Sequence, residues 1–395
     1  MKKTGILSFV IFLAILLAIT GYFEIQKQTK QNHRDETSEQ LEEQKPEPIV
    51  SAATIAAVGD VLIHKSIYRD AQKGDTYDFD VMFQAVKPYL EKPDITFANQ
   101  ESIIGGKELG LSTYPLFNSP FEIGDTLKRI GVDVVSMANN HTLDRGEQAI
   151  LNAIRHWNKI GMLYVGAYEN EIDKAKIRTI EKNGITFSFL AYTYGTNGIP
   201  VPKDKPYLVN LIDKETIEAD IQKAKQLSDV IVVSLHFGNE YERMPNESQK
   251  ELAQFIADAG AHIIFGHHPH VLQPVDFIRS KEGHDTFVAY SLGNFLAAQE
   301  AKHDHHRRIG GIVQVEVEKV EFEGETKITV HSPSFLPTYI HFRNWKNYRI
   351  LPMHSLTDNE LANAKQHYEN TKKHLSQFLP SLTFIDDETS SSPES

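Results

Sequence analysis

The sequence predicts an α/β fold in which the strands of a buried sheet alternate with helices. Five short apolar segments are rich in Val, Ile and Ala, and helical patterns lie between them, which is typical of parallel strands. The five segments are TIAAVGDVLIH, ITFANQE, VDVVSMANNH, DVIVVSLH and HIIFGHHPH. In an open α/β sheet, ligands bind outside the carboxyl ends of the strands. Because each segment ends in side chains that can bind metal, we expect a metal site at one edge of one sheet.

The candidate metal-binding side chains follow the five segments in turn. They are Asp60 and His64, Asn99 and Glu101, Asn139, Asn140 and His141, His236, and finally His267, His268 and His270. Mixed carboxylate, amide and imidazole donors suit Zn, Mn and Fe alike. We therefore expect one or two divalent metal ions as the cofactor, with no preference among these three elements.

The composition narrows the possible partners and compartment. With 395 residues the chain has room for one large α/β domain and appendages. The net charge of -12 argues against nucleic acid as a partner, because phosphate binding requires a basic surface. The absence of cysteine excludes thiol catalysis and cysteine-ligated zinc, and it suits an extracytoplasmic location. The sequence has no P-loop, no G-x-G-x-x-G and no G-x-S-x-G elbow, which disfavours nucleotide-binding and serine-hydrolase classes.

An uncharged apolar stretch from Gly5 to Phe23 predicts a membrane span. In a helix it measures roughly 28 Å, enough to cross the hydrocarbon core of a bilayer. We expect an uncleaved signal anchor; the alternative is a cleaved signal peptide, which the length of the stretch and the lack of a small-x-small cleavage site disfavour. Residues 1–4 are then a cytoplasmic tail. The chain is expected at the cell membrane, single-pass, with its globular domain outside the cell.

The rest of the chain is expected to form a stalk, one domain and two C-terminal segments. Residues 24–50 are polar and rich in Gln, Glu and Lys, which is typical of a solvated stalk. Residues 51–354 form the globular domain, and residues 355–385 form a helical extension. Residues 386–395 form a Ser-rich acidic tail that is expected to be disordered.

Apolar periodicity and capping signals predict the helices between the strands. The predicted helices cover residues 79–90, 121–130, 144–160, 216–227 and 248–260. Two of them open with the spacing of a capping box, Asp144 with Glu147 and Ser248 with Glu251.

A β-hairpin is predicted over residues 176–192, because Asn183–Gly184 is a strong hairpin turn. Later strands are predicted over residues 286–291, 312–318 and 327–331. No helical pattern separates these strands, so we expect them to run antiparallel.

The first two clusters each have a plain structural explanation beside the functional one. Asp60 follows Gly59, which lets the backbone turn sharply toward a ligand, but Gly–Asp turns are common. His64 shares a side with Asp60 only if a helical turn begins there, and is otherwise a surface histidine. Asn99 and Glu101 point to one face of an extended chain, an arrangement that suits a hard cation but also polar residues leaving a strand.

The Asn139–Asn140–His141 segment is more specific. An amide oxygen can bind a metal ion while the adjacent histidine, held off the metal, donates a proton to a leaving group. His141 is therefore the candidate catalytic residue. The alternative is an Asn-rich turn that carries a satisfied histidine.

The Gly266–His270 segment is the strongest single signal, because three imidazoles in four positions after a strand are hard to explain by packing. His268 and His270 have the alternate spacing that puts two rings on one side. Pro269 stiffens the turn between them. Spacing alone leaves open whether His267 or His268 binds the metal.

Three other segments contain residues that could contribute to the site. His236 gains weight from its neighbours, among them Glu240, and Asn294 follows a strand-to-loop switch that can line the pocket. The run His303–His306 looks like a second metal cluster. We interpret it as a charged loop that binds metal only opportunistically.

Six motifs occur in order along the chain. They are Gly59-Asp60, Asn99-Gln100-Glu101, Ala138-Asn139-Asn140-His141-x-x-Asp144-x-Gly146, His236-Phe237-Gly238-x-Glu240, Gly266-His267-His268-Pro269-His270-Val271 and Ser291-Leu292-Gly293-Asn294-Phe295. With these motifs the chain resembles the CapA family of capsule or poly-γ-glutamate synthesis proteins, also called PgsA. The resemblance runs from about Ile55 to Val317 and includes a single membrane anchor before an extracellular domain.

That family is similar in fold to the calcineurin-like metallophosphoesterases. The resemblance implies two packed mixed β-sheets flanked by helices, with two metal ions held between them. By this resemblance Asp60 is the first-strand ligand, Asn140 is the metal-binding asparagine and His141 is the general acid. His236 and the pair ending at His270 correspond to the later histidine ligands.

Two features depart from the phosphoesterase pattern. His64 stands four residues from Asp60 instead of two, and Asn99 with Glu101 replaces a metal-bridging aspartate. The predicted metal ligands are Asp60, Glu101, Asn140, His236, His268 and His270. Residues predicted to bind substrate or to support the ligands are His64, Asn99, Asn139, Asp144, Glu240, His267 and Asn294.

The leading functional hypothesis is a membrane-anchored extracellular component of poly-γ-glutamate synthesis and export that carries a divalent-metal site. Its expected partners are poly-γ-glutamate or a related anionic polymer, membrane synthase subunits and the cell membrane, without nucleic acid. Two alternatives stay open. One is a metal-dependent hydrolase or transferase that acts on a phosphoester or on the γ-glutamyl amide bond, and the other is a non-catalytic scaffold of the synthase complex.

Overall fold

The computed structural model describes residues 4–39, 47–299 and 304–386. The chain divides into two units, residues 1–48 with 322–324, and residues 49–321 with 325–395. Apart from Thr4 and Asp386, the predicted cytoplasmic tail and the predicted disordered tail lie outside the described residues.

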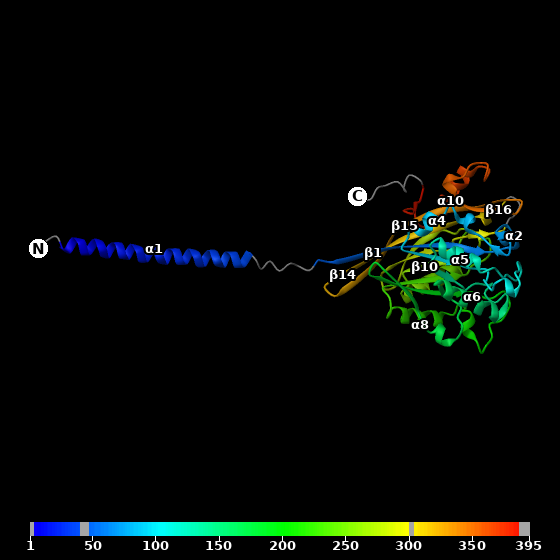
Figure 1. The fold of residues 1–395 in the computed structure, drawn as a ribbon, viewed down its shortest axis with the longest axis horizontal. Coiled ribbons are helices and arrows are strands. Elements are labelled where there is room, and N and C mark those ends of the chain that lie inside the picture. Colours follow the sequence, from blue (N-terminus) through cyan, green and yellow to red (C-terminus); the bar gives the residue numbers. More distant parts are fainter. Residues whose placement is uncertain (1–3, 40–46, 300–303, 387–395) are drawn as a thin grey trace. The chain divides into compact units, whose positions relative to one another are not determined.

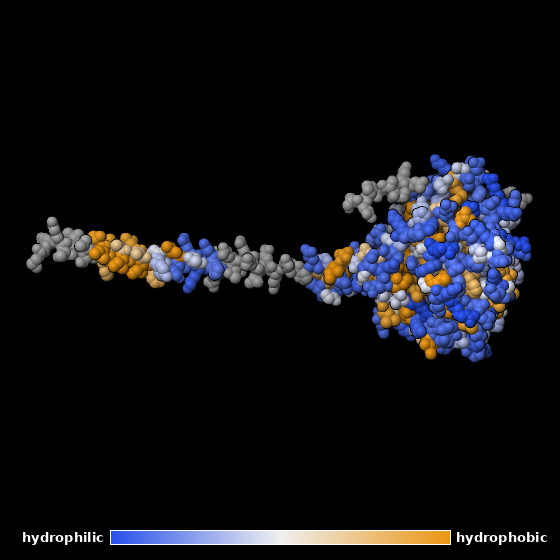
Figure 2. Space-filling view, in the orientation of Figure 1, coloured by the Kyte–Doolittle hydropathy of each residue, from blue (hydrophilic) through white to orange (hydrophobic). Residues whose placement is uncertain are grey.

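The N-terminal unit contains one long helix, α1 (Thr4–Glu39). Among the described residues it is the one helix long and apolar enough to cross a membrane, over Phe9–His33 with a mean hydropathy of 2.0. The large apolar side chains between Phe9 and Ile25 are exposed, and Figure 2 shows a hydrophobic band followed by hydrophilic residues. The helix continues into the segment predicted as a stalk, because Gln, Glu and Lys are good helix formers. Residues 40–46 of that segment lie outside the described residues.

The larger unit is built on two mixed sheets (Figure 1). Within the described residues the first sheet has nine strands, and its main path runs β16 (Lys346–Pro352), β15 (Glu325–Arg343), β14 (Ile309–Phe322), β1 (Ile49–Leu62), β4 (Ile95–Asn99), β5 (Val134–Ser136) and β6 (Leu163–Val165). Two further strands complete this sheet, since β13 (Asn294–Ala297) pairs with β1 and β17 (Thr383–Phe384) pairs with β15.

The second sheet has six strands among the described residues. Its order is β11 (Val275–Arg279), β12 (Asp285–Ala289), β10 (Ile263–His267), β9 (Val230–His236), β8 (Ile185–Thr193) and β7 (Arg178–Lys182). A separate pair consists of β2 (Gln72–Lys73) and β3 (Thr76–Tyr77).

Helices occupy the connections between the strands. The remaining α-helices are α2 (Lys65–Asp70), α3 (Asp80–Phe83), α4 (Lys87–Glu91), α5 (Glu122–Arg129), α6 (Gly146–Ile160), α7 (Glu171–Lys174), α8 (Lys214–Ala224), α9 (Glu247–Ala259) and α10 (Ala364–Leu375). Short 3₁₀ helices are η1 (Lys107–Leu109), η2 (Pro206–Leu208), η3 (His306–Arg308) and η4 (Met353–Ser355).

Three hydrophobic cores hold these layers together. Between the sheets, Phe97 of β4 packs against Phe189 of β8 and Phe265 of β10, with ring centroids 6.3 Å and 5.9 Å apart. A second core joins the other face of the nine-stranded sheet to α2, α3, α5 and α6, and a third joins the six-stranded sheet to α8 and α9. The predicted fold class, two packed mixed sheets flanked by helices, is confirmed.

The structure corrects the expectation that all five donor segments end at one edge of one sheet. β1, β4 and β5 belong to the nine-stranded sheet, whereas β9 and β10 belong to the six-stranded sheet. Each set is parallel within its own sheet. The two sheets pack face to face through a core that contains Phe97, Phe189 and Phe265. The donors therefore converge where the carboxyl ends of the strands of both sheets meet.

Several predicted helices differ from the structure in their bounds or caps. The helix predicted over residues 79–90 is divided into α3 and α4, because Pro88 has no N–H to donate and occupies the first turn of α4 instead. The capping box predicted at Ser248 and Glu251 is wrong. The N-cap of α9 is Asn246, two residues before Ser248, and Asn246 and Gln249 form a reciprocal capping box.

The predicted hairpin is confirmed as β7 and β8, with Asn183 and Gly184 at φ 51° and 78° in the turn. Two of the later predicted strands have the expected antiparallel partners: β14 pairs with β1, and β15 pairs with β16, a strand that was not predicted. β12 is the exception, since it runs parallel to β10 and antiparallel to β11. The segment predicted as a C-terminal helical extension contains α10 and β17, and Leu375 and Leu382 are buried in the core between the sheets.

Candidate metal centre

β1 changes its neighbour at the position of Asp60. It pairs antiparallel with β14 as far as Val58 and then parallel with β13, beginning at Asp60 opposite Asn294. Gly59 makes this possible, because a Cβ at that position would lie 1.9 Å from the carbonyl oxygen of Gly293. Asp60 was predicted to follow the strand, but it lies inside β1 at an irregularity of the pairing with β4. Its carboxylate is fully buried.

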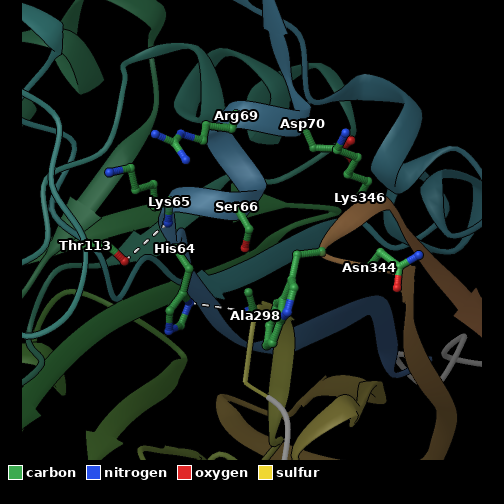
Figure 3. A pocket seen from close by; sticks show the side chains of 10 residues that line it. His64, Lys65, Ser66, Arg69, Asp70, Thr113, Ala298, Asn344 and Lys346 are labelled. Atoms are coloured by element: carbon green, nitrogen blue, oxygen red, sulfur yellow. Dashed lines mark hydrogen bonds between the residues drawn. The ribbon is translucent and has the colours of Figure 1, made fainter.

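His64, at the other end of this segment, does not join Asp60. It is the N-terminal cap residue of α2, and its Nδ1 lies 3.0 Å from the carbonyl oxygen of Leu62 and 3.2 Å from the amide nitrogen of Ala298. Its ring lines a separate pocket shown in Figure 3.

β4 places Asn99 and Glu101 beside Asp60. The amide nitrogen of Asn99 donates to Oδ1 of Asp60 over 2.8 Å, and the backbone N–H of Glu101 donates to Val61 over 3.1 Å. The Glu101 carboxylate is fully buried, and neither of its oxygens has a hydrogen-bond partner among the described residues. A fully buried carboxylate that accepts no hydrogen bond is costly, and a bound cation would offset that cost.

The second sheet supplies the imidazoles from β9 and the loop after β10. His236 ends β9 opposite His267 in β10. In the following loop His268 and His270 adopt positive φ angles of 96° and 59°, which cost about 1–3 kcal/mol each in residues other than glycine. Such strain persists where the surroundings enforce it, and it commonly marks a functional site.

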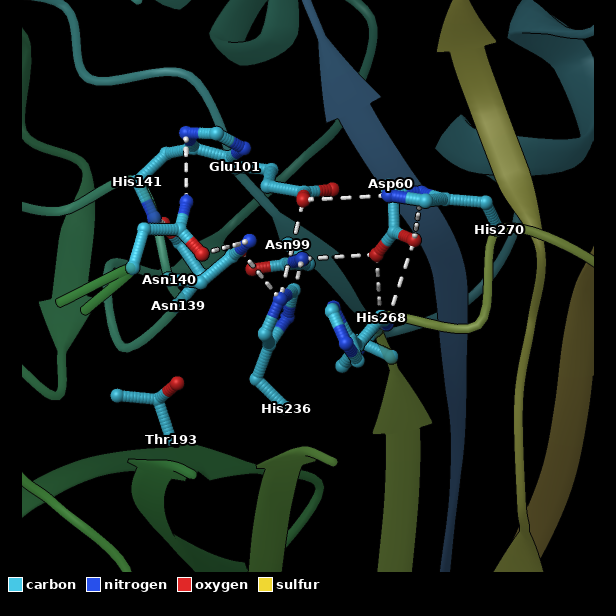
Figure 4. A network of polar contacts seen from close by, with 12 residues as sticks. Asp60, Asn99, Glu101, Asn139, Asn140, His141, Thr193, His236, His268 and His270 are labelled. Atoms are coloured by element: carbon cyan, nitrogen blue, oxygen red, sulfur yellow. Dashed lines mark hydrogen bonds and ion pairs between the residues drawn. The ribbon is translucent and has the colours of Figure 1, made fainter. Parts of the chain in front are cut away.

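These side chains meet around the Glu101 carboxylate (Figure 4). Oε1 of Glu101 lies 3.7 Å from Nε2 of His236 and 3.7 Å from Nε2 of His270, while Oδ2 of Asp60 lies 3.1 Å from Nδ1 of His270. Three groups have all their donor atoms within 4.8 Å of one another: Glu101, His236 and His268; Glu240, His268 and His270; and Asp60, Glu101 and His270. Donors around one cation at about 2.1 Å lie roughly 3 to 4 Å apart. The arrangement fits a divalent cation.

The electrostatics of the cluster also fit a cation. Burial raises the pKa of the Glu101 carboxyl well above its usual range, and burial lowers the pKa of His268 to about 3. Burial also opposes charge on His270, but the facing Glu101 and Asp60 carboxylates outweigh it and raise its pKa to about 9. Without a metal ion, the negative charge of this cluster is therefore offset by protons, one on the Glu101 carboxyl and one on the His270 ring. A divalent cation supplies the offsetting positive charge directly.

The two asparagines after β5 have different tasks. Oδ1 of Asn140 lies 2.8 Å from Nε2 of His236, which puts the Asn140 amide at the cluster. Asn139 supports the loop instead: its side chain donates to the carbonyl of Gln100 over 3.0 Å and accepts from the amide of His141 over 3.0 Å.

Asp144 was predicted to cap a helix, but it binds His141. The capping box is wrong because α6 begins only at Gly146, without a side-chain cap. Instead Oδ2 of Asp144 lies 2.7 Å from Nδ1 of His141 and accepts from the amide of Phe117 over 2.6 Å. The Phe117 ring lies 4.7 Å from the His141 ring. His141 is thus fixed through Nδ1, beside the cluster, and only 6% exposed.

The other predicted residues lie at different distances from the cluster. Nδ1 of His267 lies 3.5 Å from Oδ1 of Asp60, and its ring stacks on Phe97. Oδ1 of Asn294 lies 3.1 Å from Nδ1 of His270, so Asn294 contacts a candidate ligand. Glu240 is exposed but lies within one of the three donor groups.

The second histidine run stays apart from this cluster. His303 lies outside the described residues, while His305 and His306 are half-buried and belong to none of the donor groups. The His305 ring packs against His367 of α10 at 5.3 Å.

The sequence analysis missed the loop after β8. Asn197 accepts from the Asn140 side chain over 3.1 Å, and its own amide nitrogen lies 3.4 Å from Nδ1 of His141. The Tyr194 ring lies 4.6 Å from the His268 ring. The signal was available, because β8 is a sixth apolar segment followed by polar residues, but it was interpreted only as half of a hairpin.

Comparisons with known proteins agree with the motifs. The family model described as "Bacterial capsule synthesis protein PGA_cap" matches residues 54–299. The PGA biosynthesis protein CapA of Bacillus subtilis is 31% identical over 295 residues, which cover 70% of this chain and 73% of that protein. The capsule biosynthesis protein CapA of Bacillus anthracis is 31% identical over 261 residues, which cover 62% of this chain and 60% of that protein.

A solved structure of NAD nucleotidase from Haemophilus influenzae aligns with 86% of this chain and 59% of that chain. The TM-score is 0.45 at 12% identity, and nothing about the chemistry of this chain rests on that likeness. The family model, by contrast, spans more than half of the chain and contains β1, β4, β5, β9 and β10. This chain belongs to the bacterial capsule synthesis protein PGA_cap family.

Proposed function

We propose that this chain is a membrane-anchored, cell-surface component of poly-γ-glutamate synthesis and export whose domain holds one or two divalent metal ions. The similarity to the CapA proteins of Bacillus subtilis and Bacillus anthracis supports the pathway. The observation that supports the metal site is the Glu101 carboxylate. It is fully buried, its Oε1 lies 3.7 Å from Nε2 of both His236 and His270, and neither of its oxygens accepts a hydrogen bond from the described residues.

The proposed ligands come from both sheets. They are Asp60, Glu101, Asn140, His236, His268 and His270. Of the two adjacent histidines we assign His268 as a ligand, because it belongs to two donor groups while the His267 ring is stacked on Phe97. Asn99, Asn139, Asp144, His267 and Asn294 hold these groups in position, and Glu240 stands at the exposed side.

We assign the cell membrane as the location, with α1 as the single span and the domain outside the cell. The exposed apolar surface of Phe9–His33 supports the anchor, since such a surface is costly in water. In this arrangement the domain meets the nascent anionic polymer and the membrane synthase subunits.

Elemental analysis of the full-length protein in detergent tests the metal site. We expect about one or two Mn, Zn or Fe ions per chain, and a Glu101→Gln variant with less than about one tenth of that content. The control variant Glu218→Gln removes an exposed carboxylate of α8 that belongs to none of the donor groups, and it is expected to keep the full metal content. A wild-type protein that contains no metal after preparation without chelators contradicts the proposal.

A second candidate function is metal-dependent hydrolysis, which the His141–Asp144 pair specifically favours. A bound divalent cation supplies Lewis acidity at the cluster. Asp144 holds the His141 ring through Nδ1, which leaves Nε2 as the nitrogen that delivers a proton to a leaving group. Phe117 packs against this ring and limits its contact with water.

The hydrolase function is tested with His141→Gln in the full-length protein. We expect the variant to keep its metal content and to lose at least about a hundredfold in turnover of poly-γ-glutamate or a simple phosphodiester. Unchanged turnover removes His141 from the mechanism. A His141→Gln strain that still makes capsule at the normal level, with metal retained, supports the non-catalytic scaffold.

A further inference from the structure

A pocket of about 700 Å³ lies apart from the metal cluster and has no role in the function proposed so far. Its walls are formed by His64, Lys65, Ser66, Arg69, Asp70, Thr113, Ala298, Asn344, Trp345 and Lys346. Figure 3 shows Lys65 and Arg69 of α2 on one side and Asn344 and Lys346 of the β15–β16 hairpin on the other. Segments distant in the sequence thus build one cavity.

The charge of this pocket is opposite to that of the chain. Lys65, Arg69 and Lys346 are exposed, and none of them forms an ion pair with any residue that the structure describes. The one carboxylate in the wall, Asp70, accepts a hydrogen bond from the backbone N–H of Tyr348 over 2.9 Å. That hydrogen bond leaves the negative charge of Asp70 in place, so three cations face one carboxylate. The lining keeps an excess of positive charge in a chain of net charge -12, and such a pocket attracts an anion.

The hairpin tip holds an aromatic side chain at the pocket at a conformational cost. Asn344 and Trp345 adopt φ angles of 51° and 59°, the signature of a two-residue turn that prefers Asn–Gly. A tryptophan at positive φ is strained, yet Trp345 is 45% exposed and stacks on Phe342 with centroids 5.1 Å apart. The strained, exposed ring adds an apolar contact surface beside the three cations.

Two paired strands connect the pocket to the metal cluster. β1 and β13 run parallel, with Asp60 opposite Asn294 at the cluster. Four residues further along the chain in each case, just beyond the ends of β1 and β13, His64 and Ala298 line the pocket. The amide nitrogen of Ala298 lies 3.2 Å from Nδ1 of His64. Four extended residues span about 13 Å, so one flexible chain can reach both places. The Phe117 ring also contacts both the His64 ring, at 5.1 Å, and the His141 ring.

We propose that this pocket binds carboxylate groups of a polyanionic chain, whose neighbouring units lie at the metal cluster. Lys65, Arg69 and Lys346 pair with the carboxylates, and Trp345 packs against the aliphatic part of the chain. The assignment of the ligand as a polycarboxylate rests on the proposed function. Isolated carboxylates bind weakly to exposed lysines, but several at once on one chain gain from effective concentration.

The probe is soluble poly-γ-glutamate of defined length, added to the full-length protein in detergent. The chain has two tryptophans and Trp157 is fully buried, so quenching of Trp345 fluorescence reports binding at the pocket. We expect the combined variant Lys65→Gln, Arg69→Gln and Lys346→Gln to weaken binding at least about tenfold, and salt to weaken binding of the wild type. Trp345→Phe is expected to abolish the fluorescence change while calorimetry still detects binding.

A matched control removes the same charge elsewhere. Lys223→Gln, Lys250→Gln and Arg279→Gln change two lysines and one arginine, with side chains 58%, 45% and 66% exposed, on α8, α9 and β11. We expect this variant to bind the polymer as the wild type does. Equal weakening by both triple variants shows non-specific attraction and overturns the proposal.

Two further outcomes separate this inference from the proposed function. Wild-type affinity in the pocket variant, in protein that contains its metal, overturns the pocket and leaves the metal site standing. If the wild-type protein contains no metal after preparation without chelators, and its binding of the polymer is still weakened by the pocket variant, the pocket is supported and the metal site is contradicted. Polyphosphate of equal charge that binds as tightly, and is equally weakened by the pocket variant, overturns the assignment of a polycarboxylate ligand.

Discussion

Two histidine-rich loops of this chain have similar local sequences and different surroundings. Gly266–His270 and His303–His306 each place three imidazoles within four positions. In the first loop, the three rings are 1–4% exposed, and carboxylates from β1 and β4 face them. In the second loop, His305 and His306 are half-buried and no described carboxylate group converges on them to form a donor set.

The backbones of the two loops also differ. His268 and His270 are held at positive φ, whereas His305 has an ordinary φ of −84°. At the start of the first loop, Gly266 of β10 lies against the backbone of Tyr290, which follows the neighbouring strand β12 of the same sheet. Local composition therefore does not make a metal site. Convergence of donors from separate strands does.

The largest expected effect separates the two loops directly. His268→Ala with His270→Ala is expected to reduce bound metal to less than about one tenth of the wild-type content, since it removes two of the proposed ligands. His305→Ala with His306→Ala removes the same number of imidazoles and is expected to leave the content unchanged. Elemental analysis of full-length protein in detergent measures both. If both double variants lose the same amount of bound metal, the two loops do not differ in their ability to bind metal, and the prediction is wrong.

The next largest effect is expected on the free energy of unfolding, when the close contact between Gly266 and the backbone of Tyr290 is disturbed. A Cβ on Gly266 would lie 2.0 Å from the carbonyl oxygen of Tyr290, which is backbone and cannot rotate away. Gly266→Ala is therefore expected to lower the free energy of unfolding by about 3 kcal/mol or more, measured by denaturant unfolding. Gly195→Ala meets nothing within 4 Å and is expected to change it by less than about 0.5 kcal/mol.

His262, a half-buried histidine outside both loops, shows what an imidazole costs without a metal. Burial lowers the pKa of His262 to about 4, and its Nδ1 accepts a hydrogen bond from Ile231 over 3.1 Å. The folded state holds this ring neutral, while the unfolded chain takes up a proton near pH 6.5. The stabilisation is thus complete above pH 6.5 and is lost as pH falls toward 4.

Between pH 7 and pH 5 this single group is expected to cost about 2 kcal/mol of stability. In His262→Gln, which keeps a hydrogen-bond acceptor, the free energy of unfolding should depend on pH less steeply by that amount. Unfolding is followed with a chelator present, so that metal release does not contribute. Parallel pH curves for variant and wild type contradict the prediction.

The smallest expected effect concerns the stability of the second loop. His305→Ala with His306→Ala removes half-buried side chains and one ring contact with His367. The free energy of unfolding is expected to change by less than about 1 kcal/mol, measured in denaturant. A loss of more than about 3 kcal/mol indicates that this loop has a structural role that its described contacts do not reveal.

Much of the site could be predicted because buried strands have a recognisable local pattern of apolar residues. Apolar runs that end in Asp, Asn and His located the segments of Asn99, Asn140, His236 and His270, and the structure brings these segments together. The Asn183–Gly184 hairpin followed equally from local turn chemistry. These features depend on residues close in sequence, so a single chain is enough to identify them.

Other features depended on contacts that no local pattern contains. Asp144 and Glu147 have capping-box spacing, yet Asp144 is recruited by His141 and Phe117. The irregular register at Asp60 arises because β13, more than two hundred residues later, replaces β14 as the neighbour of β1. Asn197 joined the site from a strand that was interpreted only as part of a hairpin.

The sequence by itself determined which residue types this protein can offer to a cation, and the order of the strands that carry them. The tertiary structure decided that those strands belong to two sheets, that His64 faces a basic pocket, and that Glu101 is buried without a hydrogen bond from the described residues. The physical reason is the range of the forces. Strand and turn preferences act between neighbours in the chain, whereas burial and electrostatic compensation depend on every segment that packs around a group.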